Sequence, residues 1–153
     1  MGYGNSPLEK SRIYHHEHPK NYSFLMHDPN KEYGGHVIYY DESRYRVKSS
    51  KTSNFITEDN DNAIIFMGDS YTEGLQVSFE KTFADIIGKT LEVPTLNLGV
   101  SSYSPILYKS QVKNEVVQSQ GSLIIMQVYS NDFHDDNKYL SREKYNKNFQ
   151  GID

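Results

Sequence analysis

The sequence predicts an α/β domain with a parallel sheet of about three core strands, preceded by a polar segment with a β-hairpin. Three short apolar runs, each bounded by turn-forming or polar residues, follow residue 62. The two intervening segments carry apolar residues at helical spacing. Strands that alternate with helices in this way form parallel sheets with right-handed crossovers. Residues 1–60 lack the alternation, so we expect two units, 1–60 and 61–153.

The three apolar runs are the predicted strands of the sheet. They are residues 63–67 (AIIFM), 93–100 (VPTLNLGV) and 122–132 (SLIIMQVYSND). A continuous apolar run is typical of a strand that is covered on both faces. We expect the spatial order 2-1-3, with the first run in the centre.

Two helices are predicted between these strands. Ser78 is a suitable N-cap for a helix whose apolar residues run from Phe79 to Leu91 at helical spacing. Ser104 followed by Pro105 is a second start signal, because proline is favoured at the first helical position. That helix should end near Gly121.

The N-terminal segment has one regular feature. Val37–Tyr40 and Tyr45–Lys48 are β-prone runs that flank a short polar loop, which indicates a hairpin. By composition, residues 51–62 (KTSNFITEDNDN) form a loop or linker. The segment should pack beside or beneath the parallel sheet.

Composition excludes several classes of function. The net charge is −4, with 16 basic and 20 acidic residues, so nucleic acid is not an expected partner. The absence of cysteine excludes thiolate zinc sites and cysteine nucleophiles. No apolar run approaches the roughly 20 residues of a membrane span. The stretch HHEHP contains metal-ligand types at His15, His16, Glu17 and His18, but neighbouring residues seldom converge on one ion. We expect no metal and no organic cofactor.

The ends of the three strands carry the chemistry. Ligands of open parallel sheets bind beyond the carboxyl ends of the strands. There the sequence has a hydroxyl nucleophile at Ser70, a glycine N–H at Gly99 and a carboxamide at Asn131. Acyl transfer needs a nucleophile and donors aimed at the oxyanion that develops in the transition state. Asp69 and Asp132 should instead hydrogen-bond within their turns.

At these positions the chain resembles the SGNH (GDSL-type) hydrolases. FMGDSYTEG resembles the first family block, with Ser70 at the place of the nucleophile. LNLGVSSYS resembles the second and VYSND the third, with Gly99 and Asn131 at the places of the oxyanion-hole glycine and asparagine. The resemblance implies a three-layer, flavodoxin-like parallel sheet, truncated here to about three strands. It also implies a serine acyl hydrolase or acyltransferase acting on esters of an O-acetylated glycan or a lipid.

The chain departs from the family in its catalytic base. The family's base belongs to an Asp-x-x-His block far downstream, which this chain lacks. Three hypotheses follow: the base lies beyond Asp153 or on another chain, the chain is a catalytically incomplete module that binds glycans or esters, or His134 is a substitute base. A second departure is Tyr129, which replaces a family glycine.

Two further expectations concern oligomeric state and cellular localisation. A sheet that lacks its outer strands leaves an apolar edge bare, so we expect a homo-oligomer formed through that edge. The family resemblance favours an extracytoplasmic location, while the chain carries no export signal. Localisation is therefore left open.

Overall fold

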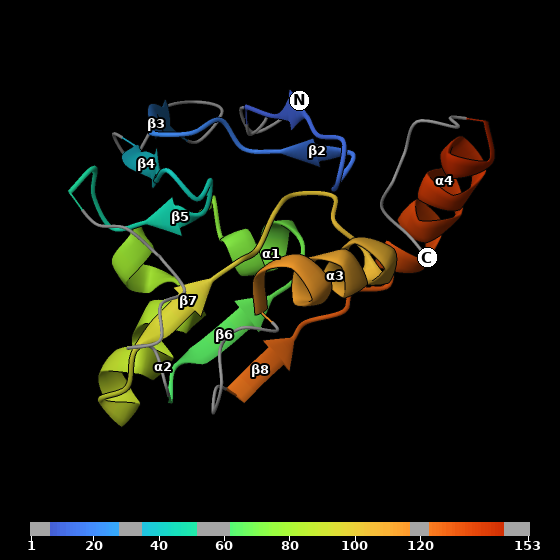
Figure 1. The fold of residues 1–153 in the computed structure, drawn as a ribbon. Helices are drawn as coiled ribbons and strands as arrows, with labels where there is room; N and C mark the ends of the chain where they lie inside the picture. The colour runs from blue at the N-terminus through green and yellow to red at the C-terminus, as the bar shows by residue number, and fades with distance from the viewer. Residues whose placement is uncertain (1–6, 28–34, 52–61, 117–122, 146–153) are drawn as a thin grey trace.

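A computed structural model describes residues 7–27, 35–51, 62–116 and 123–145, with side chains up to residue 140. It is a mixed α/β structure with three sheets (Figure 1). The strands are β1 (Glu9–Lys10), β2 (His16–Glu17), β3 (Tyr22–Met26), β4 (His36–Tyr40), β5 (Arg46–Val47), β6 (Ile64–Met67), β7 (Thr95–Asn97) and β8 (Leu123–Met126). The α-helices are α1 (Ser70–Glu73), α2 (Phe83–Leu91), α3 (Pro105–Gln111) and α4 (Asp132–Tyr145).

The parallel sheet has the strand order β7-β6-β8, as the sequence predicts. Ile65 of β6 lies opposite Leu96 of β7 and Ile124 of β8. Side chains of β6 alternate between two cores. Ile64 and Phe66 pack with Ala84 of α2, while Ile65 and Met67 belong to the cluster that contains Leu107 of α3. All four are buried, which explains the unbroken apolar run.

The outer strand β8 differs from β6 in its exposure. Leu123, Ile124, Ile125 and Met126 are 57%, 39%, 37% and 44% exposed. Successive side chains of a strand point to opposite faces, so both faces of β8 are open to solvent. The apolar edge that the sequence predicts is therefore present in the described residues.

The predicted start of the first helix is wrong by one turn. Ser78 precedes a short 3₁₀ helix, Phe79–Lys81, and its side chain makes no cap hydrogen bond. Helix α2 begins at Phe83 and has Thr82 as its N-cap, because the Thr82 hydroxyl accepts from the Asp85 N–H. The second helix begins at Pro105 as predicted, but α3 continues as a π-helix, Val112–Val116. Its predicted end at Gly121 lies outside the described residues.

The N-terminal segment contains more sheet than a single hairpin. Strands β3, β4 and β5 form an antiparallel sheet in that order, and the additional strand β3 pairs with β4 from Tyr22 to Met26. Strands β1 and β2 form a separate pair. In Figure 1 both sheets lie above the parallel sheet, on the side of α1. Tyr14 and Tyr45 join the same core cluster as Leu107, so the segment contributes to the core of the α/β part.

No helix among the described residues is long and apolar enough to cross a membrane. The linker predicted for residues 51–62 lies mostly outside the described residues.

Candidate functional site

Ser70 lies where the central strand turns into a helix. It is the first residue of α1, two residues beyond Gly68 at the end of β6, and it is half-buried. As expected, Asp69 is a turn residue, since its Oδ1 accepts from the Tyr71 N–H at 2.9 Å. The Ser70 carbonyl accepts from the N–H of Gly74, whose left-handed φ of 71° ends the helix. No described residue forms a hydrogen bond with the Ser70 hydroxyl.

Asn131 lies at the start of helix α4. Its carbonyl accepts from the N–H groups of His134 at 2.9 Å and Asp135 at 3.1 Å, and its side chain is exposed. The next residue, Asp132, is buried. One carboxylate oxygen of Asp132 accepts from the Tyr108 hydroxyl and from the Tyr129 N–H, both at 3.0 Å. Asp132 is therefore structural, as the sequence indicates.

The turns that contain Ser70 and Asn131 are in contact. The rings of Tyr71 and Tyr129 lie 4.7 Å apart, centroid to centroid. Burial raises the pKa of Asp69, and the nearby negative charge of Asp132 raises it further. The strand ends that carry Ser70 and Asn131 are thus in contact, through Tyr71 and Tyr129.

Gly99 lies against helix α1. A Cβ at this position would stand 2.4 Å from the Glu73 nitrogen and 2.7 Å from the Thr72 carbonyl carbon, so only glycine permits the approach. The Gly99 N–H donates to Asn97 Oδ1 at 3.0 Å, and Asn97 Nδ2 donates to the Thr72 carbonyl at 2.8 Å. Binding an oxyanion at the Gly99 N–H would therefore require release of the bond to Asn97.

His134, the predicted substitute base, lies in the first turn of α4 and is exposed. No hydrogen bond joins it to Ser70 in the described part of the chain. A hollow of about 320 Å³ lies nearby, and its lining includes His15, His16, Ser102, Asp135 and Tyr139. Ser70, Gly99 and Asn131 do not line it.

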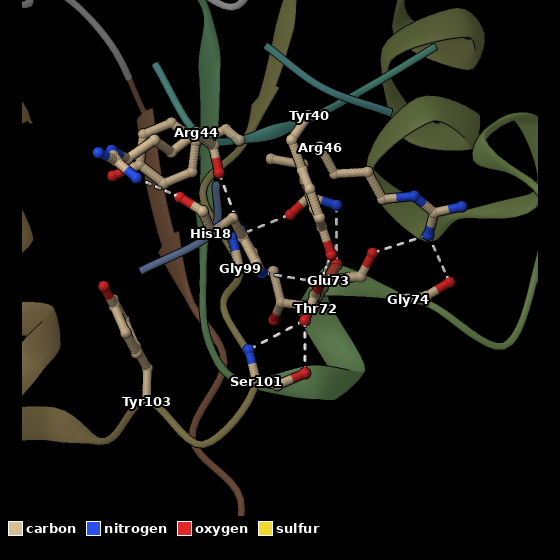
Figure 2. A network of polar contacts seen from close by, with 12 residues as sticks. His18, Tyr40, Arg44, Arg46, Thr72, Glu73, Gly74, Gly99, Ser101 and Tyr103 are labelled. Atoms are coloured by element: carbon tan, nitrogen blue, oxygen red, sulfur yellow. Dashed lines mark hydrogen bonds and ion pairs between the residues drawn. The ribbon is translucent and has the colours of Figure 1, made fainter. Parts of the chain in front are cut away.

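A buried polar network that the sequence analysis missed centres on Glu73 (Figure 2). Glu73 is fully buried at the end of α1, three residues after Ser70. Its Oε1 accepts from the Tyr40 hydroxyl at 2.6 Å and lies 2.9 Å from His18 Nε2. Its Oε2 accepts from the Ser101 N–H at 2.9 Å and from the Ser101 hydroxyl at 2.5 Å.

The His18 ring lies between a backbone carbonyl and the Glu73 carboxylate. His18 Nδ1 donates to the Arg44 carbonyl at 2.8 Å, because a carbonyl only accepts. Nε2 faces the Glu73 carboxylate on the other side of the ring. The contact has the distance of an ion pair but not the direction of a hydrogen bond. Burial alone would raise the pKa of Glu73, but the charge of His18 and the hydrogen bonds lower it to about 2.

A second imidazole holds the other side of Ser101. His16 Nε2 donates to the Ser101 carbonyl at 2.8 Å, so its Nδ1 is free to accept from His15 Nδ1 at 3.0 Å. Burial lowers the pKa of His16 to about 4, which keeps the ring neutral at pH 7. The Tyr103 hydroxyl donates to the His16 carbonyl at 2.8 Å.

Arg46 fixes the chain after α1. Its Nη1 donates to the carbonyls of Glu73 at 2.8 Å and Gly74 at 2.5 Å, and its Nη2 donates to that of Val77 at 2.6 Å. The side chain is fully buried, and burial lowers its pKa. Three backbone acceptors thus replace the water that this guanidinium loses.

The HHEHP stretch serves this network in the structure. No group of three or more His, Cys, Asp or Glu side chains in the described ranges is placed to hold a metal ion. His16 and His18 instead contact Ser101 and Glu73. His16 lies in β2 and His18 directly follows it, with one residue between the two histidines. That spacing in an extended chain was the available signal that both point inward.

Comparison of the chain with protein-family models, curated proteins and solved structures found no match.

Proposed function

We propose that the chain is a serine acyl hydrolase or acyltransferase of the SGNH type that acts on an ester, such as an O-acetyl group on a glycan or a lipid. The observation that carries the proposal is the contact between two turns. Ser70, with its hydroxyl unpaired among the described residues, begins the helix after the central strand. The neighbouring turn, joined by Tyr71 and Tyr129, presents the exposed carboxamide of Asn131. A nucleophile beside a donor is the arrangement that acyl transfer needs.

In the proposed reaction the Ser70 hydroxyl loses its proton to a base and Oγ attacks the ester carbonyl carbon. The carbonyl oxygen becomes an oxyanion, which the N–H groups of Ser70 and Gly99 and the Asn131 amide stabilise. The carbon–oxygen bond to the alcohol then breaks, and the departing oxygen takes the proton from the base. Water or an acceptor hydroxyl attacks the acyl-enzyme and restores Ser70. The proposal includes the three-layer, flavodoxin-like arrangement of the family.

The proposal has two forms, which differ in the residue that acts as the base. His134 is the candidate among the described residues, and a base from outside them is the other form. A catalytically incomplete module that binds glycans or esters is the second candidate function. It is favoured by the bond between the Gly99 N–H and Asn97, which occupies one predicted oxyanion donor.

A serine-directed fluorophosphonate probe tests the proposal. We expect labelling of the intact chain at Ser70, its loss in Ser70→Ala and its retention in Ser78→Ala. Ser78 is a matched control because it is half-buried and its side chain makes no cap hydrogen bond. Loss of labelling in His134→Ala would identify the base. Absence of labelling in the wild type would favour the binding module or a site that is incomplete without a base from elsewhere.

A further inference from the structure

Ser101 fixes the loop that follows β7, because each of its polar groups forms a hydrogen bond. Ser101 donates its N–H and its hydroxyl to Glu73, and its carbonyl accepts from His16. Two of these bonds reach a carboxylate that is 0% exposed. Hydrogen bonds to a buried charge are stronger than those between neutral groups. A loop fixed in this manner has one defined position relative to α1.

We propose that Glu73 is a positioning residue, which holds residues 99–102 at a fixed distance from Ser70. The inference rests on the proposed function and deepens it. Glu73 and Ser70 belong to the same short helix, and Ser101 follows Gly99 by two residues. The carboxylate thus links the predicted nucleophile to the loop that carries a predicted oxyanion donor.

The ionised form of Glu73 satisfies the donors of Ser101 and Tyr40. Oε1 faces the Tyr40 hydroxyl and His18 Nε2, and Oε2 faces the N–H and hydroxyl of Ser101. A carboxylate accepts at both oxygens, whereas a protonated carboxyl group has a donor at one of them. The ionised form therefore accepts all three bonds, two from Ser101 and one from Tyr40. The stacking of His18 on the Tyr40 ring, at 4.0 Å and 9°, holds the imidazole in place beside Glu73.

The N-terminal segment supplies the groups on which this arrangement depends. His16, His18 and Tyr40 all precede residue 60, while Glu73 and Ser101 belong to the α/β part. The contacts of Glu73 with Tyr40 and His18, and that of Ser101 with His16, thus cross between the two predicted units. The segment is consequently part of the site rather than an attachment to it.

The test compares four variants of the full chain, two at the proposed contact and two controls. Glu73→Gln keeps the size of the side chain and an acceptor for Ser101, but removes the charge. Ser101→Ala removes one of the two bonds to Glu73 and leaves the N–H bond. Ser104→Ala is the control, because the Ser104 hydroxyl is buried without a described partner in the same loop region. Amide hydrogen exchange of residues 99–103 and the rate of fluorophosphonate labelling are measured for each.

In Glu73→Gln we expect the exchange rate of the Ser101 amide to rise by roughly tenfold or more, because its hydrogen bond to a charge is lost. We expect the rate of Ser70 labelling to fall by a similar factor. Ser101→Ala should show a smaller fall in labelling, and Ser104→Ala none. Ile38→Val provides a control for stability, because Ile38 is buried in a different cluster. If labelling falls as far in Ile38→Val as in Glu73→Gln at equal loss of stability, the effect is one of stability alone and the proposal is overturned.

The outcomes separate the two proposals. Faster exchange at Ser101 in Glu73→Gln, in a chain whose wild type is never labelled, would count against an active Ser70 in this chain and retain the loop-holding role of Glu73. Unchanged exchange and unchanged labelling in a folded Glu73→Gln variant would overturn the inference while leaving the hydrolase intact. If Glu73→Gln does not fold, Ser101→Ala decides by the same two measurements.

Discussion

Acidification should destabilise the fold through the Glu73 network. The pKa of Glu73 is about 2 in the fold, against an ordinary value of 4.5. Each pKa unit corresponds to about 1.4 kcal/mol, so ionised Glu73 contributes about 3 kcal/mol at neutral pH. Because the folded pKa is the lower one, this contribution is complete above pH 4.5 and is lost as the pH falls toward 2. About 2 kcal/mol of it should be lost by pH 3.

The assay is urea denaturation of the wild type and of Glu73→Gln at pH values from 7 to 3. Other groups also titrate in this range, so the informative quantity is the difference in the free energy of unfolding between the two proteins. We expect that difference to shrink by about 2 kcal/mol between pH 5 and pH 3, since glutamine does not titrate. Glu80→Gln, a change at an exposed glutamate, should leave the pH dependence of the wild type intact. The reasoning is refuted if Glu73→Gln loses as much stability on acidification as the wild type.

Three other predictions concern His16, Gly99 and the sheet edge. Burial lowers the pKa of His16 from 6.5 to about 4, so its neutral form contributes about 3 kcal/mol above pH 6.5 that is lost as the pH falls toward 4. His16→Gln should remove that part of the pH dependence in urea denaturation, and an unchanged curve would contradict it. Gly99→Ala should destabilise the fold by about 1–3 kcal/mol in thermal unfolding, because its Cβ would meet the Glu73 backbone nitrogen at 2.4 Å; an unchanged melting temperature would show that the loop yields. We propose that β8 mediates self-association, and Ile124→Lys should reduce it in sedimentation across micromolar concentrations, since a lysine on an edge strand opposes pairing. A wild type that sediments as a monomer throughout that range would reject the interface.

The parallel sheet could be predicted because its signal is local. Each strand is an apolar run of a few residues, and burial on both faces leaves no polar position inside β6. The start of α2 was harder to predict, because Ser78 and Thr82 are both acceptable caps. The 3₁₀ helix at Phe79–Lys81 separates them, and the Thr82 hydroxyl makes the hydrogen bond.

Helix α4 and the Glu73 network could not be predicted for different reasons. Helix α4 begins in a run of polar residues, where few apolar side chains mark a helical period. Glu73 and His18 are far apart in the sequence, and a buried glutamate is rare unless it is paired. Only the packing of the N-terminal segment on α1 brings its partners together. The same packing places His16 and His18 of the HHEHP stretch against Ser101 and Glu73.

The contacts of Arg46 at the end of α1 bear on where the protein can be truncated. A shortened protein beginning at Asn62 would lose the guanidinium that binds the carbonyls of Glu73, Gly74 and Val77. It would also lose Tyr40 and His18, which contact one carboxylate oxygen of Glu73. The boundary that composition suggests near residue 60 is therefore a poor place to cut, and the two halves should melt in one cooperative transition.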